Sequence, residues 1–362
     1  MSEPSVWWPI PVTSSRWFSE EERRASRQYH QPIERAVVLR SIAQGLGVVA
    51  AWLLIERTDV AWWWVVAAVL TAVTLPRLVA DAWHEFIHEP RFGGATVAPA
   101  AFAITSLGRL GLEGGFLALG YAMLTGVDNT TWTTVGVGCV AAAAPLASAL
   151  IGPRVVLLIH RAVDVPPDHE AYQHVARMAE AHDLPTPQLV ELDRASFEGA
   201  NAYVTGQRSR LTVAVSHRLL SGPDALLRHV VGHEITHLRH HHLLWSALAS
   251  SVTLGATVAA AFSATMRFAD GGARLPVFVL VAAVLSQPFR LGLAWLSRAN
   301  ERQADRAAMR HAPISPELIK QLHLSDRPLL EPSRLARWQS SHPAPAERLE
   351  AAARSTRSSP VS

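Results

Sequence analysis

Two histidines and a glutamate at fixed spacing are the residues of this sequence best suited to chemistry. His233-Glu234-Ile235-Thr236-His237 follows the pattern H-E-x-x-H, and on a helix the i, i+4 spacing places both imidazoles on one face. Because neutral imidazole is a common ligand of zinc, His233 and His237 are candidate metal ligands. Glu234 stands between them, where a carboxylate can act as a general base toward water. The motif predicts hydrolytic zinc chemistry.

A third protein ligand is needed, since catalytic zinc usually takes three and leaves one position for water. Glu301 is the candidate, because it lies just after the last long apolar stretch of the chain. Asp305, one helical turn later, faces the same way and could orient a ligating histidine through its free ring N–H. The alternative interpretation is that Glu301, Arg302 and Asp305 form a solvated helix face, and taken alone that interpretation is the simpler one.

The pattern H-E-x-x-H occurs a second time, at His84-Glu85-Phe86-Ile87-His88. A chain with 17 histidines can carry such a match by chance, and a motif alone is only a hypothesis. The presence of a third ligand separates the two matches. We therefore interpret the second one as an amphipathic stretch at the membrane surface, with no role in metal binding.

The segment 160–242 is predicted to be a water-soluble insert that holds the first motif. Proline and glycine punctuate it. Ser221 is predicted to be the N-cap of the helix that carries the motif. The other predicted elements are a helix over 168–183 and short strands at Leu189–Leu192 and Leu211–Val215.

The composition favours a membrane protein, because 49% of the 362 residues are hydrophobic and only 17% are charged. A helix needs roughly 20 residues to cross a bilayer, and stretches of about that length occur six times. The fold class that follows is mostly α: a multi-span helical membrane protein with an α+β lobe. The six predicted spans are 37–55, 60–76, 110–126, 133–159, 243–263 and 275–296.

Arginine gives the chain its formal charge of +3 and predicts its orientation. The arginines lie between apolar segments and form no single basic stripe, which argues against nucleic-acid binding. With six spans, the arginine-rich segments 1–36, 77–109 and 297–362 fall on one side together with 160–242. Short loops rich in Lys and Arg face the cytoplasm. We expect a multi-pass protein of the plasma (inner) membrane with its active site on the cytoplasmic side.

The expected organisation has six parts. The start of the chain lacks the pattern of a cleavable signal, and Cys139, the single cysteine, permits no intrachain disulfide. The parts are a polar N-terminal segment 1–36, a membrane region of about four spans 37–159, a first part of the lobe 160–242, two further spans 243–296, a second part of the lobe 297–350, and a disordered tail 351–362.

These motifs resemble, in the same order, those of the integral-membrane zinc metallopeptidases that include type I CAAX prenyl endopeptidases and HtpX-type heat-shock proteases. The resemblance covers about 160–350 and adds three segments to the first motif: Asn201-Ala-Tyr203-Val-Thr-Gly206, Ser297-Arg298…Glu301…Ala304-Asp305, and His342-Pro343…Glu347-Arg348-Leu349. A weaker likeness, of His88-Glu-Pro-Arg-Phe-Gly93 to a segment of the prenyl endopeptidases, accounts for the second motif better than a metal site does.

The resemblance implies a gluzincin-type lobe with one Zn²⁺ per chain, held by His233, His237 and Glu301, and Glu234 as the general base. It further implies a second catalytic donor at His342, and an Arg348 that fixes either the substrate or His342. Asn201 and Tyr203 would line an edge strand on which an extended peptide pairs. The ordinary alternatives are a turn residue for Asn201, a core residue for Tyr203 and a loop for His342.

The function that we expect is that of a zinc endopeptidase that cuts membrane proteins or membrane-attached peptides, with protein quality control as its role. One alternative is a protease for lipidated C-termini, although six spans are fewer than the seven expected of a prenyl endopeptidase. The other is a catalytically silent sensor or scaffold that keeps zinc for structure. Glu234 argues against the scaffold, because a structural zinc site needs no base. The sequence leaves the oligomeric state open.

Overall fold

The computed structural model describes residues 14–358, apart from gaps at 59, 94–96, 127–130, 160–161, 193–201, 208–209 and 326–328. The chain folds into two compact units, and each is described by itself. The first, called the lobe, comprises Met1–Arg27, Pro145–Ser250 and Arg290–Ser362. The second, called the helical unit, comprises Gln28–Ala144 and Ser251–Phe289.

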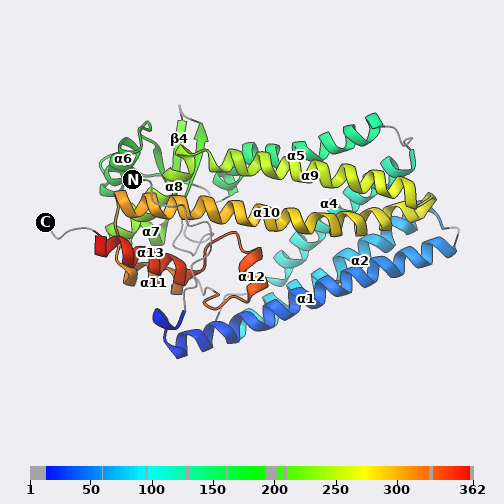
Figure 1. Cartoon of the computed structure of the whole chain (residues 1–362), viewed down its shortest axis with the longest axis horizontal. Coiled ribbons are helices and arrows are strands. Elements are labelled where there is room, and N and C mark those ends of the chain that lie inside the picture. Colours follow the sequence, from blue (N-terminus) through cyan, green and yellow to red (C-terminus); the bar gives the residue numbers. More distant parts are fainter. Residues whose placement is uncertain are drawn as a thin grey trace. The chain divides into compact units, whose positions relative to one another are not determined.

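Long apolar helices dominate the described chain (Figure 1), and six of them are long and apolar enough to cross a membrane. Helices satisfy every backbone polar group internally, as a segment in hydrocarbon must. Their number in the described chain equals the number of predicted spans. The six helices are α1 Glu20–Arg57, α2 Trp62–Trp83, α4 Pro99–Gly126, α5 Thr131–Ile159, α9 His242–Phe268 and α10 Arg274–His311.

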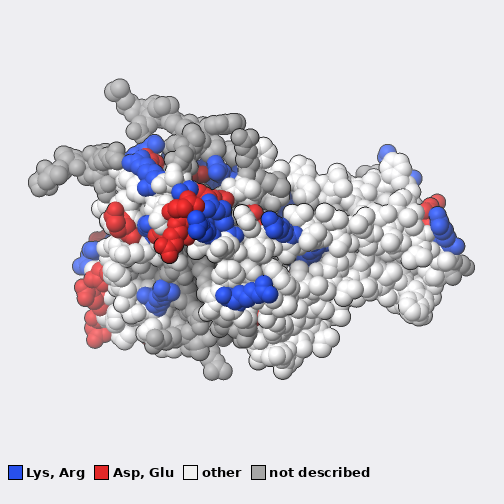
Figure 2. Space-filling view, turned by 90° about the horizontal axis from the view of Figure 1, so that it is seen from below, with Lys and Arg blue, Asp and Glu red and all other residues white. Residues whose placement is uncertain are grey.

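The surface of the helical unit shows few charged side chains, whereas Lys, Arg, Asp and Glu gather on the lobe (Figure 2). Inside the helical unit, Val69, Phe262 and Leu275 are almost fully buried. Small residues let two of its helices approach closely, because a Cβ atom on Gly255 of α9 would lie 2.8 Å from the carbonyl oxygen of Gly138 in α5.

The lobe contains a four-stranded sheet in the order β1-β2-β4-β3 within the described residues. Strand β2 runs parallel to β4, while β1 and β3 are antiparallel to their neighbours. The two strands that the sequence predicts correspond to β2 and β4 and are confirmed. The strands are β1 Val163–Asp164, β2 Gln188–Leu192, β3 Ala202–Gln207 and β4 Arg210–Ser216.

Valines on β4 alternate with smaller residues, so that Val213 and Val215 face the main core of the lobe while Ala214 faces the other side of the sheet. Helices cover the face of the sheet that carries Val213 and Val215 and so enclose the main core. The helices of the lobe are α6 Glu170–Ala181, α7 His217–Leu220, α8 Asp224–Arg239, α11 Pro316–Ser325, α12 Arg334–Gln339 and α13 Pro345–Ser358. Shorter turns of helix are η1 Ser14–Arg16, η2 His84–His88, α3 Glu89–Arg91 and η3 Gly271–Ala273.

Two predictions of local structure were wrong. Ser221 is the C-cap of α7, where its backbone N–H and its hydroxyl both donate to the carbonyl of His217, and Pro223 takes the N-cap position of α8. The predicted disordered tail is helical up to Ser358, since alanines such as Ala352 are buried in the lobe core. The N-terminal segment also contributes to that core, because Phe18 is only 2% exposed.

Candidate metal centre

Helix α8 carries the H-E-x-x-H motif and is fixed on its opposite face by the lobe core. Leu227, Val231 and Ile235 are at most 2% exposed, which leaves the other face of the helix to carry the polar motif. The two helices approach closely just before the motif, because a Cβ atom on Gly232 would lie 3.3 Å from Sδ of Met178 in α6. The packing of α8 on α6 thus sets the position of His233.

Three ligand atoms converge beside α8. The Nε2 atoms of His233 and His237 lie 3.1 Å apart. Glu301 of α10 brings one carboxylate oxygen to 3.6 Å from His233 Nε2 and the other to 3.4 Å from His237 Nε2. Bonds of about 2.1 Å around tetrahedral zinc place ligand atoms roughly 3.4 Å apart. The spacing of this group therefore suits a metal ion of that size.

The electrostatics of the site favour positive charge where the ligand atoms meet. Asp305 of α10 accepts a hydrogen bond from Nδ1 of His233 at 2.9 Å, so that the Nε2 atom of the ring points to Glu301. Burial disfavours a charged imidazole, but Asp305 and Glu301 outweigh it and raise the pKa of His233 to about 10. A site that stabilises a proton so strongly also suits a metal cation.

Glu234 is oriented into the same pocket as the ligands. Burial raises the pKa of its carboxyl above the usual value, against the opposing effect of His233 and His237. A general base works best when its pKa lies nearer the working pH than that of an exposed carboxylate. The environment of Glu234 therefore fits proton transfer.

Arg348 of α13 lies on the two carboxylates of α10. It donates from Nη2 to Glu301 Oε2, and its Nε atom lies 3.2 Å from Asp305 Oδ2. His342 also reaches Glu301, with Nδ1 at 2.9 Å from Oε2, and its side chain is 64% exposed. The structure thus brings His342, Arg348 and Asp305 together around Glu301.

A contact that the sequence did not identify supports the second histidine. Nδ1 of His237 lies 3.0 Å from Nδ1 of His242, and Nε2 of His242 lies 3.2 Å from Oε1 of Gln303. His242 is 5% exposed. Partners of this kind fix the tautomer and the orientation of a ligating imidazole. His242 is the last of three consecutive histidines, so the sequence alone does not single it out, and Gln303 belongs to no recognisable motif.

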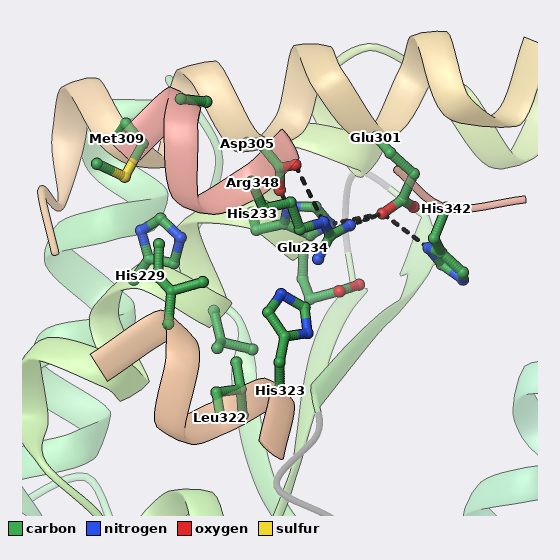
Figure 3. Close-up of a pocket in the computed structure, with 13 residues that line it drawn as sticks. His229, His233, Glu234, Glu301, Asp305, Met309, Leu322, His323, His342 and Arg348 are labelled. Atoms are coloured by element: carbon green, nitrogen blue, oxygen red, sulfur yellow. Dashed lines mark hydrogen bonds and ion pairs between the residues drawn. The ribbon is translucent and has the colours of Figure 1, made fainter. Parts of the chain in front are cut away.

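The site opens into a cavity of roughly 230 Å³, shown in Figure 3. Side chains from α8, α10, α11 and α13 line it, together with His342, which precedes α13. Glu234 points into it between the ligands and His323 of α11 (Figure 3). All of the residues that line the cavity belong to the lobe.

Of the residues predicted to bind substrate at this strand, Tyr203 does not line the cavity. Asn201 lies outside the described residues. Tyr203 packs with Val190 and Ala214 on the face of the sheet opposite to the main core, and burial raises the pKa of its hydroxyl. Its strand, β3, is nevertheless an edge strand of the described sheet, with β4 as its neighbour.

Two other groups of potential ligands have simpler explanations. Glu170 and Asp224 lie within reach of His174, but each acid occupies the first turn of a helix, where it stabilises the helix dipole. The second H-E-x-x-H forms the π-helical turn η2. Among the described residues, His84 and His88 belong to no group of three potential metal ligands.

A family model gives the arrangement its context. The model of peptidase family M48 matches residues 167–356, a range that contains every described residue of the cavity. The chain belongs to peptidase family M48. This membership supports a peptidase, and the six apolar helices support a protein of the membrane.

Three similar proteins share one name. The M48 chain is 28% identical over 272 residues to a "Protease HtpX homolog" of Nostoc punctiforme, a match that covers 66% of the chain and 91% of the relative. It is 33% identical to the protein of that name from Polynucleobacter necessarius, over 37% of the chain and 48% of the relative. The corresponding Thermoplasma volcanium protein is 31% identical, over 43% and 51%. The chain thus spans about half of these last two relatives.

The fold itself is similar to that of a solved structure. The structure of S. mikatae Ste24p matches with a TM-score of 0.67 at 16% identity, over 94% of the M48 chain and 91% of Ste24p. The predicted fold class, a multi-span helical protein with a mixed lobe, is confirmed. The chain is an integral membrane protein.

Proposed function

We propose that this M48 chain is a zinc-dependent endopeptidase that hydrolyses peptide bonds of membrane proteins or membrane-attached peptides. The observation that carries the proposal is the convergence of His233, His237 and Glu301 beside the half-buried side chain of Glu234. A structural zinc site is closed by four protein ligands, whereas a catalytic one has three and leaves a position for water. The group of three described ligands corresponds to the second kind.

One Zn²⁺ per chain would be held by the two Nε2 atoms and the carboxylate of Glu301. Imidazole nitrogen and carboxylate oxygen are both common zinc ligands, and the distances between them fit. When bound, zinc polarises the scissile carbonyl and lowers the pKa of water at the site. Asp305 and His242 would hold the two imidazoles with Nε2 directed to the metal.

Glu234 would act as the general base and then as the general acid. Its carboxylate takes a proton from the attacking water and delivers it to the leaving amine. The raised pKa that burial gives it suits both steps, because a carboxyl that titrates nearer neutral pH can accept and return a proton in one cycle. Glutamine at this position would keep the shape and remove the base.

His342 would donate a hydrogen bond to the oxyanion that develops on the substrate carbonyl. When the ring is protonated, both its N–H groups are donors. One is directed to Glu301, 2.9 Å away, and the other remains for the substrate. Arg348 holds Glu301 and Asp305 in the structure, so we assign it to orienting the metal site, in place of the predicted contact with substrate or His342.

The edge strand β3 would bind an extended peptide through main-chain hydrogen bonds. Its position at the end of the sheet order supports this. Asn201, just before the strand, would contact the peptide backbone, and Tyr203 would hold β3 in the sheet from the opposite face. Arginine-rich segments on one side of the six spans support a cytoplasmic active site at the plasma membrane. The resemblance to HtpX-type heat-shock proteases supports a role in protein quality control.

Two other functions make different predictions. A protease for lipidated C-termini, implied by the likeness to prenyl endopeptidases, would cleave only peptides that carry the lipid. A zinc-retaining scaffold would bind metal and cleave nothing. The six apolar helices are compatible with all three functions, so the choice depends on substrate.

The test compares wild type with Glu234→Gln, both purified in detergent with zinc content measured. A fluorescent membrane-protein substrate and a matched pair of peptides, with and without a prenyl group, are offered to each. We expect wild type to cut the membrane protein and the free peptide, and Glu234→Gln to lose about 10²- to 10⁴-fold in rate while keeping its zinc. Cleavage confined to the prenylated peptide would support the second candidate. Full zinc with no cleavage by wild type would support the scaffold.

A further inference from the structure

Helix α11 forms one wall of the active-site cavity and contributes three residues to it. Ile319, Leu322 and His323 all line the cavity, and their spacing of three and four residues places them on one face of the helix. The walls next to them are also apolar, with Val230 from α8 and Met309 from α10. In this part of the cavity α11 therefore presents a mostly apolar surface to a substrate.

His323 introduces a polar atom into that surface. Its imidazole points from α11 toward the side of the cavity that holds Glu234 (Figure 3). Its Nε2 atom is buried and has no hydrogen-bond partner among the described residues. The other imidazole of this region, His229, is used by the fold, because its Nδ1–H donates to the carbonyl of Ala312 at 3.0 Å. Of the described residues that line the cavity, His323 is thus the histidine whose buried ring nitrogen lacks a protein partner.

A buried polar atom costs free energy unless it gains a hydrogen bond. The metal site does not use His323, and the mechanism above assigns it no role. A substrate side chain that enters between α8 and α11 would meet apolar walls along its length and this nitrogen near them. An amide is the best match, because it offers both a donor and an acceptor to whichever tautomer the imidazole adopts.

We propose that α11 forms a pocket for the substrate residue that follows the scissile bond, and that His323 makes this pocket selective for an uncharged amide side chain such as glutamine. The assignment to that residue rests on the proposed function. Glu234 returns its proton to the leaving amine. The part of the cavity that lies beside Glu234 and away from the metal ligands should therefore bind the substrate segment that begins with that amine.

Positive charge is disfavoured in the same pocket. Burial, together with the positive charge of Arg348, lowers the pKa of His323 to about 4. A lysine side chain placed beside His323 would meet the same burial and the same guanidinium. We therefore expect lysine to be rejected, and leucine, which has the size of glutamine without its amide, to be accepted less well.

The test uses the full-length protein in detergent and three quenched peptides that differ only in the residue after the cleaved bond: glutamine, leucine or lysine. Mass spectrometry verifies the position of the cut. One hydrogen bond is worth roughly a fivefold preference, so we expect wild type to cleave the glutamine peptide about fivefold better than the leucine peptide in kcat/KM, with lysine last. In His323→Leu, the preference should change to leucine.

The matched control is His311→Leu, since His311 contacts the ring of His182 and does not line the cavity. It should keep the wild-type ratio. The inference is wrong if wild type cleaves the leucine peptide as well as the glutamine peptide, a result that needs no variant, or if His323→Leu keeps the preference for glutamine. Either result leaves the peptidase itself intact, whereas a wild type that cuts no peptide and no protein contradicts the proposed function.

Discussion

His242 lies with its Nδ1 atom 3.0 Å from the Nδ1 atom of His237. The hydrogen bond gives His237 a fixed tautomer, because the ring must donate from Nδ1 and keep Nε2 for the metal. The oxygen of Gln303 accepts from the far side of His242, which leaves Nδ1 of His242 as the acceptor. A relay of two residues thus orients one ligand, as Asp305 orients the other.

Replacing His242 with phenylalanine should weaken zinc binding. The substitution keeps the size of a buried ring but removes the acceptor for His237. Loss of such a partner typically costs about 10- to 100-fold in metal affinity. Titration with a chelator of known affinity measures the change. His240→Phe is the control, because His240 is exposed and stacks on His242 without a hydrogen bond to a ligand. Equal affinities of the two variants would contradict the relay.

Replacing Arg348 with glutamine should destabilise the lobe mainly when zinc is absent. Arg348 neutralises two carboxylates whose side chains are at most 16% exposed. Breaking a buried ion pair costs about 3–5 kcal/mol, but bound zinc would compensate part of that charge. We expect a larger fall in thermal midpoint after chelation than in zinc-loaded protein.

The matched variant for this comparison is Arg354→Gln. Arg354 is 56% exposed and pairs with Glu350 at 3.4 Å, and exposed pairs contribute at most about 1 kcal/mol. Its thermal midpoint should hardly change with or without zinc. If Arg348→Gln behaves in the same way, Arg348 does not balance the charge of the metal site.

Gly255→Ala should destabilise the helical unit. The added methyl group would lie 2.8 Å from the Gly138 carbonyl oxygen, and overpacking of this kind costs about 1–3 kcal/mol. A methyl group on Gly120 of α4 would meet no described atom within 4 Å, so Gly120→Ala should be neutral or stabilising, since alanine is the better helix former. Unfolding in detergent, followed by tryptophan fluorescence, separates the two. A similar midpoint for both would show that α5 and α9 do not pack closely.

Some of this architecture follows from local patterns and some does not. The number of spans follows from apolar length, and the H-E-x-x-H spacing fixes which side chains share a face of α8. The helical C-terminus was missed because a tail rich in Ser and Arg reads as disordered, whereas Leu349 and Ala352 gain their stability from burial in the lobe. Gln303 and His323 were also missed, and the sequence does not show which of the histidines 240–242 supports a ligand. Their positions depend on tertiary contacts between segments tens of residues apart.

The stability of the lobe should fall between pH 6.5 and 4 through His182. This histidine is 4% exposed and packs against the ring of His311 at 4.5 Å. Burial, and then the neighbouring His311, lowers the pKa of His182 to about 4, below its value of about 6.5 in the unfolded chain. Above pH 6.5 both states are neutral and the contribution to stability is complete. As the pH falls toward 4 the unfolded state binds the proton first, so unfolding is favoured, by about 2 kcal/mol at pH 5.

His182→Phe keeps an aromatic ring at this position and removes the titrating group. Its unfolding midpoint should therefore fall less than that of wild type between pH 7 and pH 5. The metal site is the same in both proteins, so the difference between them isolates His182. An equal fall in wild type and His182→Phe would contradict the assignment.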